Sequence, residues 1–319
     1  MKRKSLLNII TIGLLVLMLS IIAGCGPEKK AMTTGDEAYA VITDDLGRVV
    51  KLTKKPERIV VLSASFLEPL HAVDASIVGR PSSKTDVPDF AKDLPEVGAV
   101  YQIDVEKVLA LQPDLVIANK GMNEKFVALM ESNNIPIIVM DMKSYANVKN
   151  EVNVFAQITG EKEKGAVIVS GMDEKIKAVQ AKLPKDKKRV AILHSTAQGL
   201  SVQLDGSIAG SVAKMLGFEN VAADQIPMEK NPDATPYSLE TLVQQDPDLI
   251  FVTSMGKLEA IKKSMMDNVA GNPAWQSIPA IKNNQMYFLP QNLFLLSPGL
   301  HYPEAVEMMA KLVYPGVFK

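Results

Sequence analysis

Short apolar runs separated by helical patterns occupy the chain from residue 39 onward. Residues 39–43 and 48–52 alternate apolar and polar positions on either side of a turn-forming Asp-Asp-Leu-Gly, so they predict a β-hairpin. Other runs are almost wholly apolar and predict buried strands, at residues 58–63, 76–78, 114–118 and 136–140. Apolar spacing between them predicts helices, at residues 66–73, 105–111 and 123–132. Strands that alternate with helices indicate parallel βαβ units and an α/β fold.

The second half of the chain repeats this order. Residues 189–194 form another apolar strand pattern, and residues 104–118 and 238–252 share the order helix, Pro-Asp, strand. Glu106 in the first of these segments corresponds to Glu240 in the second. We therefore expect two similar lobes, each built around a sheet.

A helical region separates the two halves. Residues 145–183 have helical periodicity with a break near Thr159-Gly160, and a long charged amphipathic run follows at 161–183 until Pro184 ends it. A helix of that length spans roughly 30 Å at about 1.5 Å per residue, enough to run along both lobes. The region lacks a Gly/Ser-rich hinge, which favours a small rocking of the lobes over a large closure.

The N-terminus has the pattern of an export signal. Basic residues at 2–4 precede an apolar run at 6–22 and the small residues Ala23-Gly24 before Cys25. The segment ending at Cys25 resembles the bacterial lipobox, which implies an extracytoplasmic chain anchored to the cell membrane by a lipid on that cysteine. The alternative is a plain N-terminal membrane-spanning anchor, because the apolar run is close to the lower limit for spanning. The predicted organisation is a lipoprotein signal peptide at 1–24, a flexible tether at 25–38, an N-terminal lobe at 39–143, an interlobe helical linker at 144–184 and a C-terminal lobe at 185–319.

The composition narrows the possible partners. The formal net charge is −1, which argues against nucleic acid as a partner, because such proteins usually carry a basic stripe. Cys25 is the only cysteine, so no intrachain disulfide can form. Methionines number 16 while aromatic residues make up only 5% of the chain, which hints at a soft, adaptable apolar surface, although core packing explains most methionines equally well.

Several segments resemble, in the same order along the chain, the helical-backbone class (class III) of periplasmic binding proteins. These segments are residues 44–52, 56–63, 77–81, 105–117, 272–275 and 313–315. The resemblance implies two Rossmann-like lobes bridged by a single long α-helix, with the ligand cleft between the lobes. It also implies the substrate-binding component of an ABC importer, whose partners are a permease dimer with its ATPase and a small-molecule metal chelate. No intrinsic cofactor is expected.

The position of the cleft follows from the fold class. Ligands of open α/β sheets bind beyond the carboxyl ends of the strands. Candidate ligand-binding residues at such positions are Ser65, Arg80, Tyr101, Lys120, Met122 and Met142 on the first lobe, and His194, Tyr237, Met255, Phe294 and His301 on the second. Arg80 and Lys120 suit carboxylates, propionates or an oxyanion. Either histidine can instead be structural, with His301 capping the last helix.

Haem-binding members of the resembled class hold the iron between a methionine from one lobe and a histidine from the other. In this chain Tyr101 stands where that methionine would be, and Met255 stands where that histidine would be. A tyrosine phenolate can bind haem iron. The candidate iron ligands are therefore Tyr101, Met255 and His194, as a Tyr/Met or a Tyr/His pair.

Glu106 and Glu240 are the candidate permease-docking residues. In the resembled family a glutamate on each lobe faces arginines of the permease, and two matching carboxylates suit a two-fold symmetric dimer. The alternative is ordinary acidity at a helix start, which is favourable to the helix dipole.

An enzyme is the competing class of function. The sequence contains no nucleophile elbow, paired-histidine metal motif or phosphate loop, so a cell-surface chelatase or hydrolase is disfavoured. Among ligands we rank a ferric siderophore first and haem close behind. A corrinoid such as cobalamin comes third, and an oxyanion such as molybdate remains an alternative.

Overall fold

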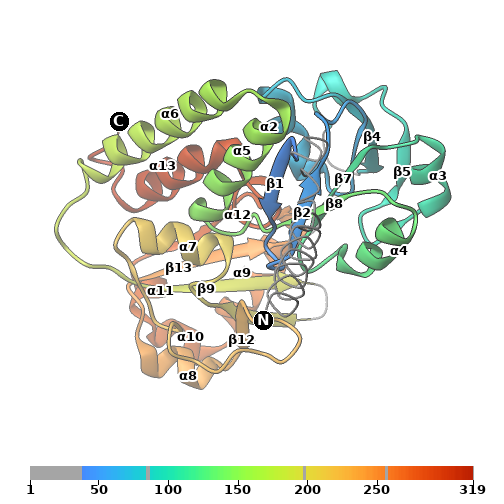
Figure 1. The fold of residues 1–319 in the computed structure, drawn as a ribbon. Coiled ribbons are helices and arrows are strands. Elements are labelled where there is room, and N and C mark those ends of the chain that lie inside the picture. Colours follow the sequence, from blue (N-terminus) through green and yellow to red (C-terminus); the bar gives the residue numbers. More distant parts are fainter. Residues whose placement is uncertain (1–37, 84–86, 197–198, 256–257, 319) are drawn as a thin grey trace, which may run out of the picture. The chain divides into compact units, whose positions relative to one another are not determined.

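The computed structural model describes residues 38–83, 87–196, 199–255 and 258–318. The predicted signal peptide, Cys25 and nearly all of the predicted tether lie outside the described residues. From Tyr39 onward the chain forms one compact unit (Figure 1). In the described part of the chain, no helix combines the length and apolarity needed to cross a membrane.

The N-terminal lobe is built on a six-stranded sheet with the order β6-β5-β4-β3-β7-β8. All neighbouring pairs are parallel except β5 with β6. The strands are β3 (Ile59–Val61), β4 (Ile77–Ser82), β5 (Glu96–Ala99), β6 (Gln102–Ile103), β7 (Leu115–Asn119) and β8 (Ile137–Met140). The expected hairpin is also present, as β1 (Ala40–Thr43) and β2 (Val49–Leu52) in antiparallel register.

Both faces of this first sheet are covered, which explains why β3 and β8 are wholly apolar and β7 is apolar up to Asn119. Successive side chains of a strand point to opposite faces, so Ile59 and Val61 join one buried cluster while Val60 joins another. The covering elements are η1 (Ala64–Phe66), α2 (Leu67–Ala72), η2 (Asp89–Ala91), α3 (Val105–Ala110), η3 (Glu124–Phe126) and α4 (Val127–Ser132).

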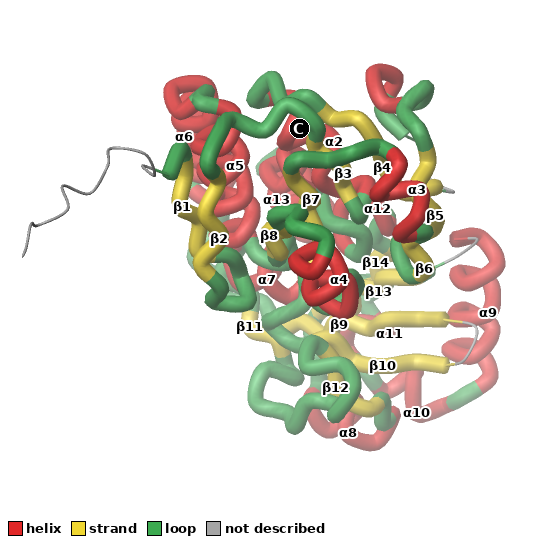
Figure 2. Tube along the Cα trace, turned by 45° about the vertical axis from the view of Figure 1, so that its right-hand side comes forward, coloured by secondary structure: helices red, strands yellow, loops and turns green. Residues whose placement is uncertain are grey.

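The C-terminal lobe has a second six-stranded sheet, with the order β12-β10-β9-β13-β14 and β11 paired to β9 (Figure 2). The strands are β9 (Arg189–Thr196), β10 (Gly199–Gln203), β11 (Glu219–Asn220), β12 (Ala234–Pro236), β13 (Leu249–Ser254) and β14 (Met286–Phe288). β9, β13 and β14 are parallel, whereas β10 runs antiparallel to both of its neighbours. The lobes are thus α/β, as the sequence predicts, and their sheets are mixed, because antiparallel strands join the expected parallel ones.

The helices of the C-terminal lobe cover its sheet and lead to the end of the chain. They are α7 (Ile208–Met215), α8 (Leu239–Gln245), α9 (Leu258–Gly271), α10 (Pro273–Ser277), α11 (Pro279–Lys282), α12 (Gln291–Phe294), η4 (Gly299–His301) and α13 (Tyr302–Val313). As in β3, alternate side chains of β13 belong to different buried clusters, Phe251 to one and Ile250 to the other.

Two helices, α5 (Tyr145–Thr159) and α6 (Lys162–Gln180), fill the region between the lobes in the sequence. Gly160 ends α5 with a left-handed φ of 81°, at the break that the sequence predicts. α6 has 19 residues and lies within the predicted run at 161–183. Ile168 of α6 packs against the main buried clusters of both lobes, and α5 contributes Tyr145 to one cluster and Phe155 to the other.

The order helix, Pro-Asp, strand that the two halves share has a structural reason. Asp114 Oδ1 accepts a hydrogen bond from the backbone N–H of Arg58 at 2.9 Å, and Asp248 Oδ2 accepts one from the N–H of Arg189 at 2.9 Å. In each lobe the aspartate at the start of one strand therefore fixes the start of its neighbour. This bond sets the register of β7 on β3 and of β13 on β9.

Candidate functional site

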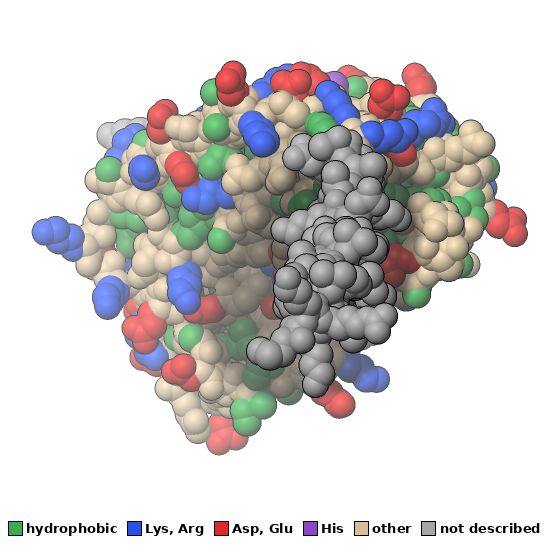
Figure 3. Space-filling model, in the orientation of Figure 1, with side chains coloured by type: hydrophobic (Ala, Val, Ile, Leu, Met, Phe, Trp, Pro, Cys, Tyr) green, Lys and Arg blue, Asp and Glu red, His purple; other side chains and the backbone are tan. Residues whose placement is uncertain are grey.

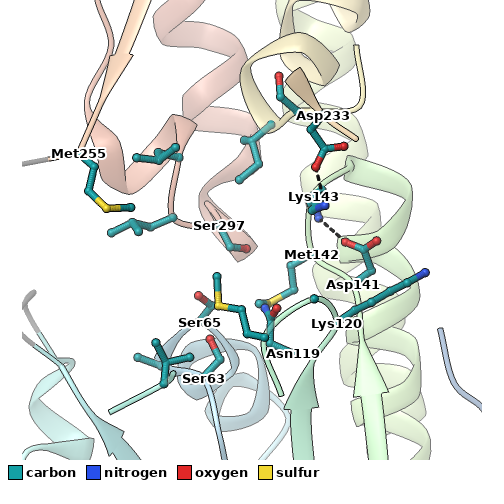
Figure 4. Close-up of a pocket in the computed structure, with 18 of the residues that line it drawn as sticks. Ser63, Ser65, Asn119, Lys120, Asp141, Met142, Lys143, Asp233, Met255 and Ser297 are labelled. Carbon is teal, nitrogen blue, oxygen red and sulfur yellow. Dashed lines mark hydrogen bonds and ion pairs between the residues drawn. The ribbon is translucent and has the colours of Figure 1, made fainter. Parts of the chain in front are cut away.

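A cavity of about 480 Å³ lies between the two lobes (Figure 4). From the first lobe its lining includes Ser63 after β3, Asn119 at the end of β7 and Asp141 after β8. From the second lobe it includes His194 near the end of β9 and Ser207 at the start of α7. The cavity therefore lies at the carboxyl ends of the parallel strands, where ligands of open α/β sheets bind.

Most of the residues predicted for the cleft are brought together here. Those that line the cavity are Ser65, Tyr101, Lys120, Met122, Met142, His194, Met255 and Phe294. They come from both lobes, and Figure 4 shows Met255 on one side of the cavity with Ser65 and Met142 on the other.

Arg80 is not among the lining residues, and its guanidinium is committed elsewhere. It is only 6% exposed. Its Nε donates to the carbonyl of Ala91 at 2.7 Å, one terminal nitrogen donates to the carbonyl of Lys92 at 3.0 Å, and the other pairs with Glu96 Oε1 at 2.9 Å. Because β4 extends to Ser82 rather than ending at 78, Arg80 lies inside the strand and holds the 91–96 segment in place.

Tyr237 also lies outside the cavity lining. Its ring stacks on Trp275 with the centroids 6.2 Å apart, against a buried apolar cluster of the second lobe. Burial raises the pKa of its phenol to about 12. This tyrosine packs on the core beneath α8 and does not reach the cleft.

His301 occupies an exposed ion cluster instead of the cavity. Its Nε2 lies 3.0 Å from Glu68 Oε2 of the first lobe, and its Nδ1 lies 2.9 Å from Glu304 Oε1 of α13. Partial burial by itself would lower the pKa of His301, but the hydrogen bonds and charges of Glu304 and Glu68 outweigh it and raise that pKa. Its role here is a contact between α2 and the start of α13.

His194 is half-buried in the cavity wall. Its Nδ1 lies 3.1 Å from the Thr253 hydroxyl, and that hydroxyl in turn donates to the carbonyl of Leu193 at 3.3 Å. The hydroxyl hydrogen of Thr253 is used in the bond to Leu193, so the Thr253 oxygen is free to accept a hydrogen from Nδ1. This arrangement favours the tautomer protonated at Nδ1, which has a lone pair on Nε2. Burial lowers the pKa of His194, which favours the neutral imidazole that binds metals.

Large apolar side chains are exposed inside this cavity. Tyr101 is 62% exposed and Met255 is 50% exposed, and Met122 is exposed as well. Together with the buried Met142 and Phe294 they form an adaptable apolar wall. Exposed apolar side chains gathered in one concave site are typical of a ligand-binding surface.

The opposite part of the cavity is charged. Lys143, which follows β8, pairs through Nζ with Asp233 Oδ2 of the second lobe at 2.5 Å. Asp141 and Lys120 lie beside this pair (Figure 4). Among the described residues, no group of three or more His, Cys, Asp or Glu side chains is placed to hold a metal ion.

The sequence analysis missed the inner wall of the second lobe. Its lining residues there are Gln203, Ser207, Ile208, Asn231 and Asp233. Gln203 ends β10, the antiparallel strand that was not predicted, and Ser207 and Ile208 follow it. Asn231 and Asp233 precede β12, which pairs with β10. The alternation of Leu200, Val202 and Leu204 after Gly199 was the available signal for that strand.

Two residues of the cavity lining each have a buried side-chain oxygen without a hydrogen-bond partner in the described part of the chain. These oxygens are Gln203 Oε1 and Ser297 Oγ, and the Gln203 side chain belongs to a residue only 8% exposed. Ser297 adopts a left-handed φ of 48°, which is uncommon for serine. Buried polar atoms are normally satisfied, so these two oxygens are exceptions for which the described residues supply no partner.

Charge on the molecular surface is mixed. On the part of the face in Figure 3 that the grey residues leave visible, basic and acidic side chains are interspersed. This distribution agrees with the balanced composition of 35 Lys and Arg against 36 Asp and Glu.

Comparison with known proteins adds three findings. The family model described as periplasmic binding protein matches residues 59–293. The chain is 27% identical to YvrC of Bacillus subtilis, named an ABC transporter substrate-binding lipoprotein, over 96% of both chains. It is 26% identical to the Fe(3+)-citrate-binding protein YfmC of the same organism, over 94% of this chain and 95% of YfmC.

A third relative has a solved structure. The chain is 25% identical to the high-affinity haem uptake system protein IsdE of Staphylococcus aureus, over 82% of this chain and 89% of IsdE. The crystal structure of IsdE with haem superposes with a TM-score of 0.70, covering 81% of this chain and 98% of that one at 24% identity. This likeness extends to the whole two-lobed fold.

Proposed function

Because this chain belongs to the periplasmic binding protein family, whose members are transport components and not enzymes, we propose that it captures an iron chelate and delivers it to the permease of an ABC importer. The observation that carries the proposal is the cavity of about 480 Å³, lined from both lobes at the carboxyl ends of their strands. A volume of this size suits a single bulky small molecule.

An iron chelate is the ligand class that the cavity and the relatives jointly favour. YfmC is named for ferric citrate and IsdE for haem uptake. The cavity offers an apolar wall containing Met122 and Met255 and a charged end containing Lys120 and Lys143. That combination suits a chelate with an apolar face and anionic groups. A ferric siderophore or ferric citrate is the first choice, and a corrinoid or an oxyanion such as molybdate is the alternative.

Haem is the second candidate, and a specific observation favours it. Tyr101, Met255 and His194 line one cavity, and the Thr253 contact of His194 favours the tautomer with a lone pair on Nε2. We assign these three as the candidate iron ligands, with Tyr101 approaching from the first lobe and the other two from the second. A phenolate, a thioether and a neutral imidazole are all known haem ligands.

Delivery requires a docking surface and an anchor. Glu106 is exposed in the first turn of α3, and Glu240 is exposed in the first turn of α8, so the two carboxylates occupy equivalent places on the two lobes. We assign them to contacts with a two-fold symmetric permease dimer that carries its ATPase. A lipid on Cys25 would hold the protein at the extracytoplasmic face of the membrane.

Small motions of the lobes suffice to capture and release the ligand. α5 and α6 each pack against apolar clusters of both lobes, at Tyr145, Phe155 and Ile168. We assign α6 the role of the bridging helix, braced by α5, which limits the lobes to a small rocking about the cleft.

The proposal is tested by titrating the purified protein with a panel of ligands and following absorption and Trp275 fluorescence. Ferric citrate, a ferric hydroxamate siderophore, haem, cobalamin and molybdate form the panel. We expect micromolar or tighter binding of at least one iron compound. If only cobalamin or molybdate bound, the proposed ligand class of iron chelates would be wrong. If none of the five bound, the proposed function would be refuted.

A further inference from the structure

One ion pair in the cavity joins the two lobes. Lys143 follows β8 of the first sheet, Asp233 precedes β12 of the second, and Lys143 Nζ lies 2.5 Å from Asp233 Oδ2 (Figure 4). Both residues line the cavity. The pair therefore forms part of the ligand site as well as a contact between lobes.

The backbone of Lys143 is held by hydrogen bonds, whereas its side chain is partly exposed. The Lys143 N–H donates to Asp141 Oδ1 at 3.1 Å, and its carbonyl accepts from the Tyr302 hydroxyl at 3.5 Å. The next residue, Ser144, caps α5 through its side chain. The Lys143 side chain is 45% exposed, so its ammonium can exchange one partner for another without any movement of the backbone.

Asp233 is held opposite Lys143 by its own surroundings. Its N–H donates to Asn231 Oδ1 at 3.2 Å, and its carbonyl accepts from the N–H of Leu204 at 2.8 Å. Its Oδ1 lies against Gly206, where a Cβ would come within 2.8 Å. The carboxylate thus fits in a space that any larger residue at Gly206 would fill, and it is directed at the lysine.

Among the cavity-lining residues that the structure describes, the formal charges cancel. Lys120 and Lys143 contribute two positive charges, and Asp141 and Asp233 contribute two negative charges. An anionic ligand that displaces an aspartate from a lysine therefore gains an attraction that the aspartate otherwise cancels. Lys143 is the lysine with such a partner, and the partner comes from the other lobe.

We propose that Lys143 is a specificity-determining residue that binds a carboxylate of the chelate, and that Asp233 competes for the same ammonium from the opposite lobe. This inference rests on the proposed function and narrows its ligand class to chelates that present a carboxylate, such as ferric citrate or haem. A neutral chelate cannot displace Asp233, so it gains nothing at this end of the cavity. Selection thus depends on charge as well as on size.

The test compares Lys143→Gln and Asp233→Asn with the wild type, using ferric citrate, haem, haem dimethyl ester and a neutral ferric hydroxamate as probes. Lys143→Gln should weaken binding of ferric citrate or haem by about tenfold or more, as expected for a lost charge-assisted hydrogen bond. Asp233→Asn should tighten the same binding several-fold, because it removes the competitor. Neither variant should change binding of the ester or the hydroxamate.

Asp74→Asn is the matched control. Asp74 pairs with Lys164 at 2.7 Å on the surface, away from the cavity lining, and asparagine tolerates its left-handed φ of 55°. If Lys143→Gln and Asp233→Asn change carboxylate binding no more than this control does, the inference is overturned and the proposed function stands. If the wild type binds only the neutral hydroxamate, the inference also fails while the function survives. Binding of none of the probes would overturn both.

Discussion

Three side chains of different chemistry meet the cavity from different parts of the chain. We predict that Tyr101→Phe, Met255→Ala or His194→Ala shifts the Soret band of the haem complex, because each variant removes a candidate axial ligand. His301→Ala is the matched control, since its ring lies outside the cavity between Glu68 and Glu304. The measurement is the absorption spectrum of each purified variant with one equivalent of haem. Four identical spectra would show that none of these residues binds the iron.

Arg80 illustrates a residue whose chemistry suggested ligand binding but whose bonds are structural. Arg80→Ala would leave the carbonyls of Ala91 and Lys92 and the carboxylate of Glu96 without their donor. We predict a loss of about 3 kcal/mol in the free energy of unfolding, measured by urea denaturation. Ligand affinity of the folded protein should stay unchanged. A large loss of ligand affinity with unchanged stability would contradict this prediction and show that Arg80 contributes to ligand binding.

At the scale of single residues, the strand-end rule predicted many of the residues that line the cavity. It did so where a buried apolar run ends in a polar turn, as at Lys120 after β7 and at His194 near the end of β9. It failed at Arg80 because the strand is longer than its apolar stretch. The Lys143–Asp233 pair was beyond sequence reasoning, since the two residues are 90 positions apart and nothing local links them.

Among the elements, α5 contains an unusual group. Glu151 is fully buried, and neither of its carboxylate oxygens has a hydrogen-bond partner in the described residues. Burial, together with the nearby charge of Asp45, raises the pKa of Glu151 well above 4.5. A carboxyl whose pKa is raised by folding binds more protons when folded, so its contribution to stability falls as pH rises from about 4.5 through the folded pKa.

Glu151→Gln removes this titration from α5. We predict that the variant is increasingly more stable than the wild type as pH rises, with the difference smallest near pH 4 and largest at pH 8. Urea unfolding at pH 4, 6 and 8 measures it. Parallel pH profiles for the two proteins would contradict the raised pKa, because only a group that titrates differently in the folded state can separate them.

The elements themselves were predictable where their signal is local. Helix and strand patterns located α3, β7, α8 and β13, because capped helices and continuously apolar parallel strands leave clear periodicities. The short antiparallel strands β10 and β12 of the second sheet were missed, although the β1–β2 hairpin was predicted. β10 and its partner β12 have half-exposed positions and depend on a long connection, so their pairing is decided by the tertiary fold and not by the local sequence.

At the scale of the whole molecule, α3 and α8 carry Glu106 and Glu240 at equivalent places on the two lobes, and we propose these two helices as the surface that contacts the permease. We predict that the double variant Glu106→Lys/Glu240→Lys loses most uptake activity in cells that carry the importer, while its ligand affinity is unchanged. Reversing two charges at a rim disturbs the match with the permease and leaves the cavity intact. The matched control is Glu163→Lys/Glu259→Lys, which reverses two exposed first-turn glutamates on α6 and α9. Equal losses in both double variants would mean that net charge alone decides uptake.

The central claim is that an iron chelate occupies the cavity between the lobes. Crystals grown with saturating ferric citrate or haem, measured at the iron absorption edge, test it most directly, because the anomalous signal locates the iron without any assumption about the ligand. The account predicts a single strong iron peak inside the cavity, between the Met255 side and the Lys143 side. An iron peak outside that cavity, or none in crystals of protein that binds the chelate in solution, would contradict it.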